Sequence, residues 1–384
     1  MRRSFEVDVN PEIIKWVRKS AGWSIEEIAS KLKTSIENYK RIESGIKKPT
    51  YRQLELLSKY LKRPLSVFFL PRPPQEEPIA SSFRILPKAE NLYSKEFRLA
   101  LRKARYYQSV AKELMSAIGY DMSAPINKYT LSNSPKTAAQ KEREGAGISI
   151  EKQLKWKNAH EAFNNWRRIV EKENILIFQF KFPLKDARGF CLMGTPPIIV
   201  INSSDNILAR IFTLFHEYAH ILLGISEVYI EEIITDRRVE EWCNSFAAEF
   251  LIPGSIVKED SDFKILTQLE GNVLEILEEL SKKYKVSKKA ILVRLKTLNL
   301  INYKQYETFI QAIEEKPIIE EKPNEEKKTF FLSPEKRCIQ EKGEKFISIV
   351  LESKEKGIIT THEAIEYLSI KLKYMNRIEN FLAA

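Results

Sequence analysis

The sequence feature that most constrains this chain is an H-E-x-x-H pentapeptide at residues 216–220, which lies inside an apolar run. The run predicts a helix, and positions four apart share one face of a helix. His216 and His220 can therefore present two imidazoles to one metal ion. Glu217 lies beside them and can take a proton from a water that attacks a peptide carbonyl. Such a pentapeptide also occurs by chance. However, the chain has only four histidines in 384 residues, so two at ligand spacing favour a metal site.

A catalytic zinc site needs a third protein ligand in addition to the two histidines. The next plausible donor lies on a second predicted helix, residues 239–250, which ends before Pro253. Glu240 opens that helix, and we predict it as the third ligand, with Glu241 as the alternative. Cys243 follows on the same face, and we expect it to be a small packing residue rather than a ligand.

Two segments carry a resemblance to a known family. Residues 210–220 (RIFTLFHEYAH) and residues 240–253 (EEWCNSFAAEFLIP) resemble the ImmA/IrrE family of zinc metallopeptidases. In that family, a Glu that opens an E-x-x-(A/C)-N-x-F-A-A helix completes the H-E-x-x-H site. The resemblance implies an α+β, zincin-like peptidase domain that binds Zn²⁺, with Glu217 as the catalytic base. The metal ligands that it implies are His216, His220 and Glu240.

The N-terminal segment, residues 9–70, predicts five short helices. They cover residues 11–20, 25–32, 36–43, 50–61 and 64–70. Ser24 and Ser35 precede the second and third helices as N-cap residues, and a tight turn at residues 33–34 joins the two. This is a helix-turn-helix arrangement, in which the second helix of the pair enters the major groove of DNA.

The same segment resembles the Cro/C1 repressor-type (XRE) DNA-binding domain, through GWSIEEIA, TSIENYKRIESG and KPT within residues 22–50. One departure is Ile25, where many members carry a Gln that supports operator contacts. Asn and Glu can read base edges, whereas Lys and Arg can hold phosphates. The outward face of the third predicted helix offers Ser35, Glu37, Asn38, Lys40 and Arg41. We expect a double-stranded DNA operator as partner and a homodimer, because such domains read two half-sites. The alternative is a module that mediates only dimerisation.

The charge of the chain is unevenly placed. The net charge is +11, and residues 1–71 hold 15 Lys/Arg against 8 Asp/Glu. Such an excess is typical of a segment that meets a polyanion, although it also serves solubility. The three cysteines form no C-x-x-C pair, which argues against a disulfide framework. The sequence begins without an apolar signal core and has no membrane-spanning run, so we expect a cytoplasmic protein without a membrane partner.

The remaining segments predict further organisation. Apolar runs at residues 175–182, 189–193 and 198–201 predict a small antiparallel sheet beside the metal helix, where a sheet edge could hold an extended peptide. Residues 132–147 are poor in apolar side chains and predict a loop. Residues 285–295 resemble a second helix-turn-helix, for which packing is the expected role. The predicted domains are 1–70 (helix-turn-helix), 71–95 (Pro-rich linker), 96–149 (helical connector), 150–303 (peptidase), 304–342 (charged linker) and 343–384 (helical segment).

Together these features predict a mostly α, multidomain chain: a five-helix DNA-binding domain, an α+β metallopeptidase domain and a helical C-terminal segment. The resemblances imply a transcription regulator fused to a zinc-dependent endopeptidase that cleaves a repressor, an antitoxin or itself, as relatives do under stress. The alternative is a transcription regulator or antitoxin whose metallopeptidase-like domain senses or binds without hydrolysing. Glu217 argues against that alternative, because a sensor needs metal ligands but no general base.

Overall fold

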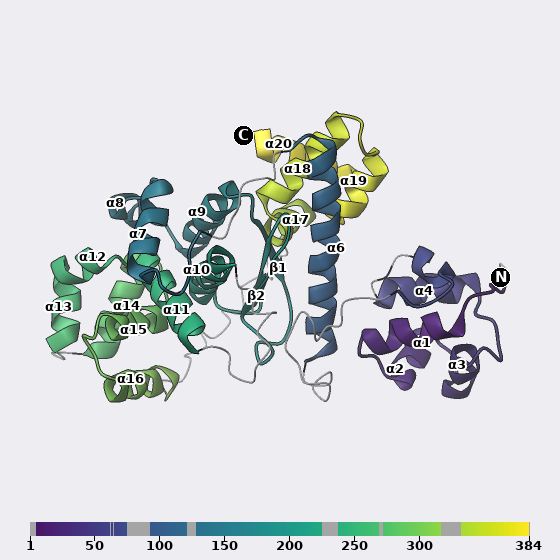
Figure 1. Cartoon of the computed structure of the whole chain (residues 1–384), viewed down its shortest axis with the longest axis horizontal. Coiled ribbons are helices and arrows are strands. Elements are labelled where there is room, and N and C mark those ends of the chain that lie inside the picture. The colour runs from purple at the N-terminus through teal and green to yellow at the C-terminus, as the bar shows by residue number, and fades with distance from the viewer. Residues whose placement is uncertain are drawn as a thin grey trace, which may run out of the picture. The chain divides into compact units, whose positions relative to one another are not determined.

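The chain folds as a mainly helical protein with one small sheet, seen in a computed structural model (Figure 1). It divides into two compact units, Met1–Tyr106 with Lys181–Asp186 and Tyr107–Phe180 with Ala187–Ala384. The structure describes residues 5–61, 63, 65–74, 93–120, 128–224, 237–268, 272–315 and 332–383. Among these residues, no helix is both long and apolar enough to cross a membrane.

The N-terminal unit contains the predicted bundle of short helices. They are α1 (Pro11–Ser20), α2 (Ile25–Lys31), α3 (Ile36–Glu43), α4 (Tyr51–Leu61) and the 3-10 helix η1 (Leu65–Phe69). Ser24 and Ser35 cap α2 and α3 as predicted, and Ser24 forms a capping box with Glu27. Lys33, in the turn between α2 and α3, has a φ of +53°. These local signals place each helix end within a residue or two of its predicted position.

A buried ion pair ties α1 to α3. The Arg18 guanidinium donates to both carboxylate oxygens of Glu43, at 2.8 and 2.7 Å, and to the carbonyl of Trp23 at 2.7 Å. The hydrogen bond to Glu43 raises the pKa of Arg18 above its ordinary value. The pair therefore fixes the orientation of α3 within the bundle.

The second unit is built around a three-stranded sheet of β1 (Leu176–Phe180), β2 (Gly189–Leu192) and β3 (Ile198–Asn202). The strand order is β1-β3-β2, with β1 parallel and β2 antiparallel to β3. The prediction of a wholly antiparallel sheet is therefore wrong. Each strand does run opposite to the one before it in the sequence. However, the apolar β3 lies in the centre of the sheet, so it pairs with β2 in antiparallel and with β1 in parallel orientation.

Both faces of this sheet are buried. On one face, Ile177 and Ile199 belong to the same core as Phe215 of α10 (Ile207–Leu223), the helix that lies beside the sheet in Figure 1. On the other face, the ring of Phe178 stacks on the ring of Tyr107 of α6 (Lys95–Ala117), and the two ring centroids lie 5.1 Å apart. Two helices then pack beside α10: α9 (Ala159–Lys172) and α11 (Arg237–Leu251).

One predicted loop is a helix. Residues 132–147 contain α7 (Pro135–Gly145), which begins with a Ser134 cap and a proline in its first turn. Its buried residues include Ala138 and Ala139, and it packs against α11. Small alanines allow a close helix contact without a large apolar stripe, which explains why the hydropathy pattern missed this helix.

The second helix-turn-helix-like pair, α14 (Val273–Tyr284) and α15 (Lys288–Thr297), packs as expected. Ile291, Leu292 and Leu295 are buried in the large core, and α15 contacts α11. Arg294 forms a buried ion pair with Glu249 of α11. One broad side of α15 therefore serves packing, while Lys289 and Lys296 on the other side are exposed.

The remaining elements cover the sides of the second unit. They are α8 (Ile150–Leu154), α12 (Gly254–Glu259), α13 (Ser261–Gln268), α16 (Tyr303–Glu315), α17 (Pro334–Lys342), α18 (Glu344–Glu355), α19 (Thr361–Leu368), η3 (Leu372–Tyr374) and α20 (Met375–Ala383). Of the two predicted linkers, residues 75–92 and 316–331 lie outside the described residues, while α16 and α17 occupy the ends of the second one.

Candidate metal centre and nucleic-acid interface

Helix α10 carries the H-E-x-x-H residues into the interior of the second unit. The Asn206 side chain caps its first turn, and Gly224 ends it in the left-handed conformation, with a φ of +67°. Four residues apart, His216 and His220 face the same way, and their Nε2 atoms lie 3.2 Å from each other. His220 is completely buried.

Helix α11 brings a carboxylate to this pair. The two Glu240 oxygens each lie 3.3 Å from one imidazole Nε2, Oε2 from His216 and Oε1 from His220. Burial alone would raise the pKa of Glu240, but hydrogen bonds from the two histidines outweigh it and hold that pKa far below its ordinary value. The alternative, Glu241, is exposed and pairs with Arg237 at 2.9 Å. The geometry therefore brings Glu240, and not Glu241, to the histidines.

These three residues fit the ligand set of a catalytic zinc ion. One ligand atom from each of His216, His220 and Glu240 can be chosen so that all lie within 4.8 Å of one another. Two imidazole nitrogens and one carboxylate form the His₂Glu set found in zinc peptidases. Cys243 is fully buried and, as expected, stands apart from this group as a packing residue.

Asn244 orients one of the histidines. Its Oδ1 lies 3.1 Å from Nδ1 of His216, on the side of the ring opposite Nε2. Such a partner fixes the ring orientation and the tautomer of a metal-ligating histidine. Asn244 is not among the site residues predicted from the sequence, although its position four residues after Glu240 places it on the same face of the helix.

Glu217 lies in a confined space between α10 and the sheet. Its side chain is 2% exposed. Gly189 at the start of β2 faces it, and a Cβ at that position would lie 2.6 Å from Cγ2 of Thr213 and 3.4 Å from Oε1 of Glu217. Only a glycine allows this close approach of strand and helix. Within the described residues β2 is an edge strand of the sheet, and its first residue, Gly189, lies beside the carboxylate.

The back of α10 is anchored to the rest of the unit. The Tyr218 hydroxyl donates to Glu142 of α7 at 2.8 Å, and Tyr129 donates to the other oxygen of the same carboxylate at 2.9 Å. Burial and the neighbouring Glu142 raise the pKa of Tyr218 well above its ordinary value. These contacts restrict rotation of the helix, so the two histidines stay directed toward α11.

The residues of α3 and its N-cap that we predicted to face DNA differ in whether their side chains are already hydrogen-bonded within the domain. Glu37, Lys40 and Arg41 are exposed. The Ser35 hydroxyl is engaged as the N-cap of α3, accepting from the Asn38 backbone at 3.1 Å. The Asn38 amide is held as well, since it donates to Thr34 at 2.6 Å and accepts from Lys47 at 3.0 Å. In this conformation, the charged residues are presented to solvent and the two small polar ones serve the fold.

An H-E-x-x-H helix paired with a carboxylate-bearing helix, next to a small sheet, defines a metallopeptidase-like domain. Comparison with protein families agrees: residues 170–296 match the Peptidase_M78 family, described as the IrrE N-terminal-like domain, and residues 14–68 match a helix-turn-helix family. No curated protein and no solved structure matches the chain significantly. The chain therefore carries a helix-turn-helix domain followed by an IrrE N-terminal-like domain, as the sequence predicted.

Proposed function

We propose that this chain is a DNA-binding regulator whose second domain is a zinc-dependent endopeptidase, and that it cleaves a regulatory protein. The observation that carries the proposal is the convergence of His216, His220 and Glu240 beside the buried Glu217. In this proposal the first three are zinc ligands and Glu217 is the catalytic base. The retained base favours hydrolysis over a domain that only senses or binds a metal.

In the proposed hydrolysis, the chemistry is divided between a zinc ion and side chains of this protein. A zinc ion held by the three ligands would polarise the scissile carbonyl and an attacking water. Glu217 accepts the proton from that water and passes it to the leaving amine. In this proposal the outer edge of β2 pairs with the substrate backbone as an added strand, and Gly189 brings that strand close to the Glu217 carboxylate.

In this proposal the N-terminal domain directs the chain to its DNA target. Its family match supports DNA binding. In our proposal α3 enters the major groove, with Lys40 and Arg41 on phosphates and Glu37 near base edges. Ser35 and Asn38 contribute only if their present hydrogen bonds are exchanged for contacts with DNA. We propose a homodimer, since two half-sites are the usual target of such domains.

The peptidase proposal can be tested without knowing the substrate. Zinc-loaded wild type and Glu217→Gln are added separately to a lysate of cells from which the gene has been deleted, and new protein N-termini are identified by mass spectrometry. We expect new termini with wild type that are absent with Glu217→Gln, although both bind zinc. The same set of termini with both proteins would contradict the assigned base. No new termini with either would favour the non-hydrolysing alternative.

A further inference from the structure

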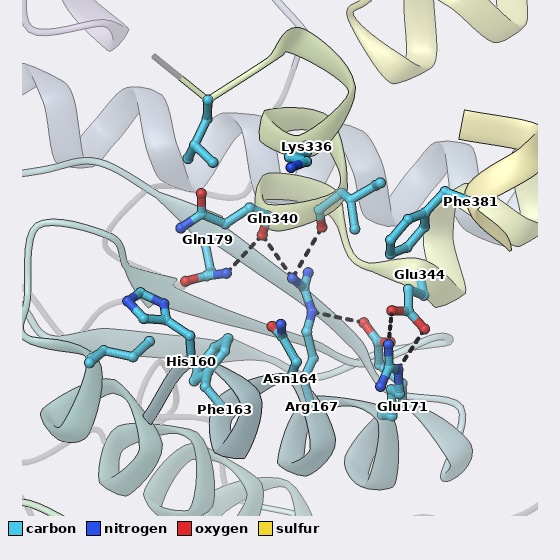
Figure 2. A pocket seen from close by; sticks show the side chains of 14 residues that line it. His160, Phe163, Asn164, Arg167, Glu171, Gln179, Lys336, Gln340, Glu344 and Phe381 are labelled. Atoms are coloured by element: carbon cyan, nitrogen blue, oxygen red, sulfur yellow. Dashed lines mark hydrogen bonds and ion pairs between the residues drawn. The ribbon is translucent and has the colours of Figure 1, made fainter. Parts of the chain in front are cut away.

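A second site lies away from the metal cluster, where the C-terminal helices meet the sheet. It is a cavity of about 300 Å³ (Figure 2). One wall comes from α9, β1 and the first residue of α10, and the other from α17, the start of α18 and Phe381 of α20. None of the metal-cluster residues lines it. The cavity is therefore distinct from the candidate active site.

The floor of the cavity is held in shape by a buried guanidinium. Arg167 donates to Glu171 at 3.0 Å and to the carbonyl of Gln340, at the C-terminal end of α17, at 2.7 Å. The Gln179 side chain of β1 donates to the same carbonyl at 2.8 Å. Figure 2 shows Arg167 between these partners. These bonds connect α9 and β1 to α17, so the two walls form one rigid site.

The charges of these bracing groups cancel. Arg167 is paired with Glu171, and Arg168 forms a bidentate pair with Glu344 at 2.8 Å. Lys336 differs from them: it is exposed, and within the described residues its side chain makes no hydrogen bond or ion pair. The cavity therefore keeps one positive charge that is available to a ligand.

The remaining surface is suited to an apolar body. Phe163 lies buried in the α9 wall, whereas Leu332 and Phe381 are each 46% exposed and offer apolar surface at the cavity. His160 and Asn164, both exposed on α9, add polar groups at the same rim. Apolar walls with a few polar groups are typical of small-molecule sites, and about 300 Å³ is at the lower end of their size range.

We propose that this cavity binds a small organic anion with an aromatic or other apolar body. The acidic group of the ligand faces Lys336, and its body lies on Phe163 and Phe381. The ligand contacts α9 and β1 on one wall and the C-terminal helices α17 and α20 on the other. Its binding therefore stabilises the attachment of those helices, because a ligand stabilises the form that it binds.

The test uses two fluorescent probes that share one scaffold. The anionic probe is 8-anilinonaphthalene-1-sulfonate, and N-phenyl-1-naphthylamine is the same molecule without the sulfonate. Full-length wild type is titrated with each, alongside Lys336→Glu and Arg337→Glu. Arg337 is a matched control because it is the next residue of α17, is exposed, and does not line the cavity.

We expect saturable binding of the anionic probe to wild type at one site per chain. Lys336→Glu should weaken it by roughly tenfold, as expected for loss of a charge-assisted contact, while Arg337→Glu leaves it unchanged. The neutral probe should bind all three proteins with equal affinity. Phe381→Ser should weaken binding of both probes, since it removes part of the apolar wall. Absence of saturable binding to wild type, or equal affinity of the anionic probe for wild type and Lys336→Glu, would overturn the proposal.

Discussion

Two helix pairs carry the chemistry that we assign to this chain, and they use opposite faces. In α10 and α11, the polar groups of interest point inward and converge, so that three ligand atoms lie within 4.8 Å of one another. In α2 and α3, the buried faces are apolar, and Glu37, Lys40 and Arg41 point outward. One pair concentrates polar groups in the interior, and the other spreads charge over the surface.

The two arrangements should respond differently to change. A converging buried cluster depends on every member, because each ligand completes the same coordination set. An exposed charged face acts through separate phosphate contacts, each of which adds a modest, salt-dependent increment. Substitutions in the metal cluster should therefore have large effects on zinc binding, while those on α3 should have graded effects on DNA binding.

The largest effect should come from the third ligand. Glu240→Gln should raise the dissociation constant for zinc by more than about 100-fold, because it removes a direct ligand. Loss of a residue that only hydrogen-bonds to a ligand costs up to about 100-fold, and loss of the ligand itself should cost more. Glu241→Gln is the matched control and should change it little, since Glu241 is exposed and paired with Arg237. Competition with a chromophoric chelator measures both. Equal effects of the two substitutions would remove Glu240 from the ligand set.

A smaller effect is expected from the residue behind His216. Asn244→Ala should weaken zinc binding by about 10- to 100-fold, because the imidazole loses the partner that orients it. Ser245→Ala, at the next position of the same helix, should leave zinc binding unchanged. If Asn244→Ala binds zinc as tightly as wild type, the hydrogen bond serves packing alone.

The smallest effects should come from α3. Lys40→Ala and Arg41→Ala should each weaken binding to mixed-sequence duplex DNA by a modest factor, and each should reduce the slope of log K against log salt by about 1. Lys59→Ala, on the exposed side of α4, is the control and should keep the slope. Fluorescence anisotropy at several salt concentrations measures these values. An unchanged slope in both α3 variants would favour a module used only for dimerisation.

The sequence predicted these two helix pairs unequally well. The ends of α2 and α3 depend on local caps such as Ser24 and Ser35, so they could be predicted within a residue or two. The spacing of His216 and His220 is likewise local. The choice between Glu240 and Glu241 depends on how α11 rotates against α10, which only the packing of the two helices determines. The sequence could narrow the third ligand to two candidates.

Other features could not be predicted because they depend on distant contacts. The parallel pairing of β1 with β3 follows from which strand occupies the centre of the sheet, and apolar runs alone do not specify that order. Helix α7 uses alanines where a larger apolar stripe is the usual signal. The contact of Gly189 with Glu217 joins a strand to a helix and has no local signature beyond a glycine in a strand.

The central claim is that α10 and α11 form a zinc site with a separate catalytic base. Elemental analysis of purified wild type, His216→Ala and Glu217→Gln tests it most directly. We predict close to one zinc per chain in wild type and in Glu217→Gln, and none in His216→Ala. Absence of zinc from well-folded wild type, even after reconstitution, would contradict the claim and leave a DNA-binding regulator with an inert peptidase-like domain.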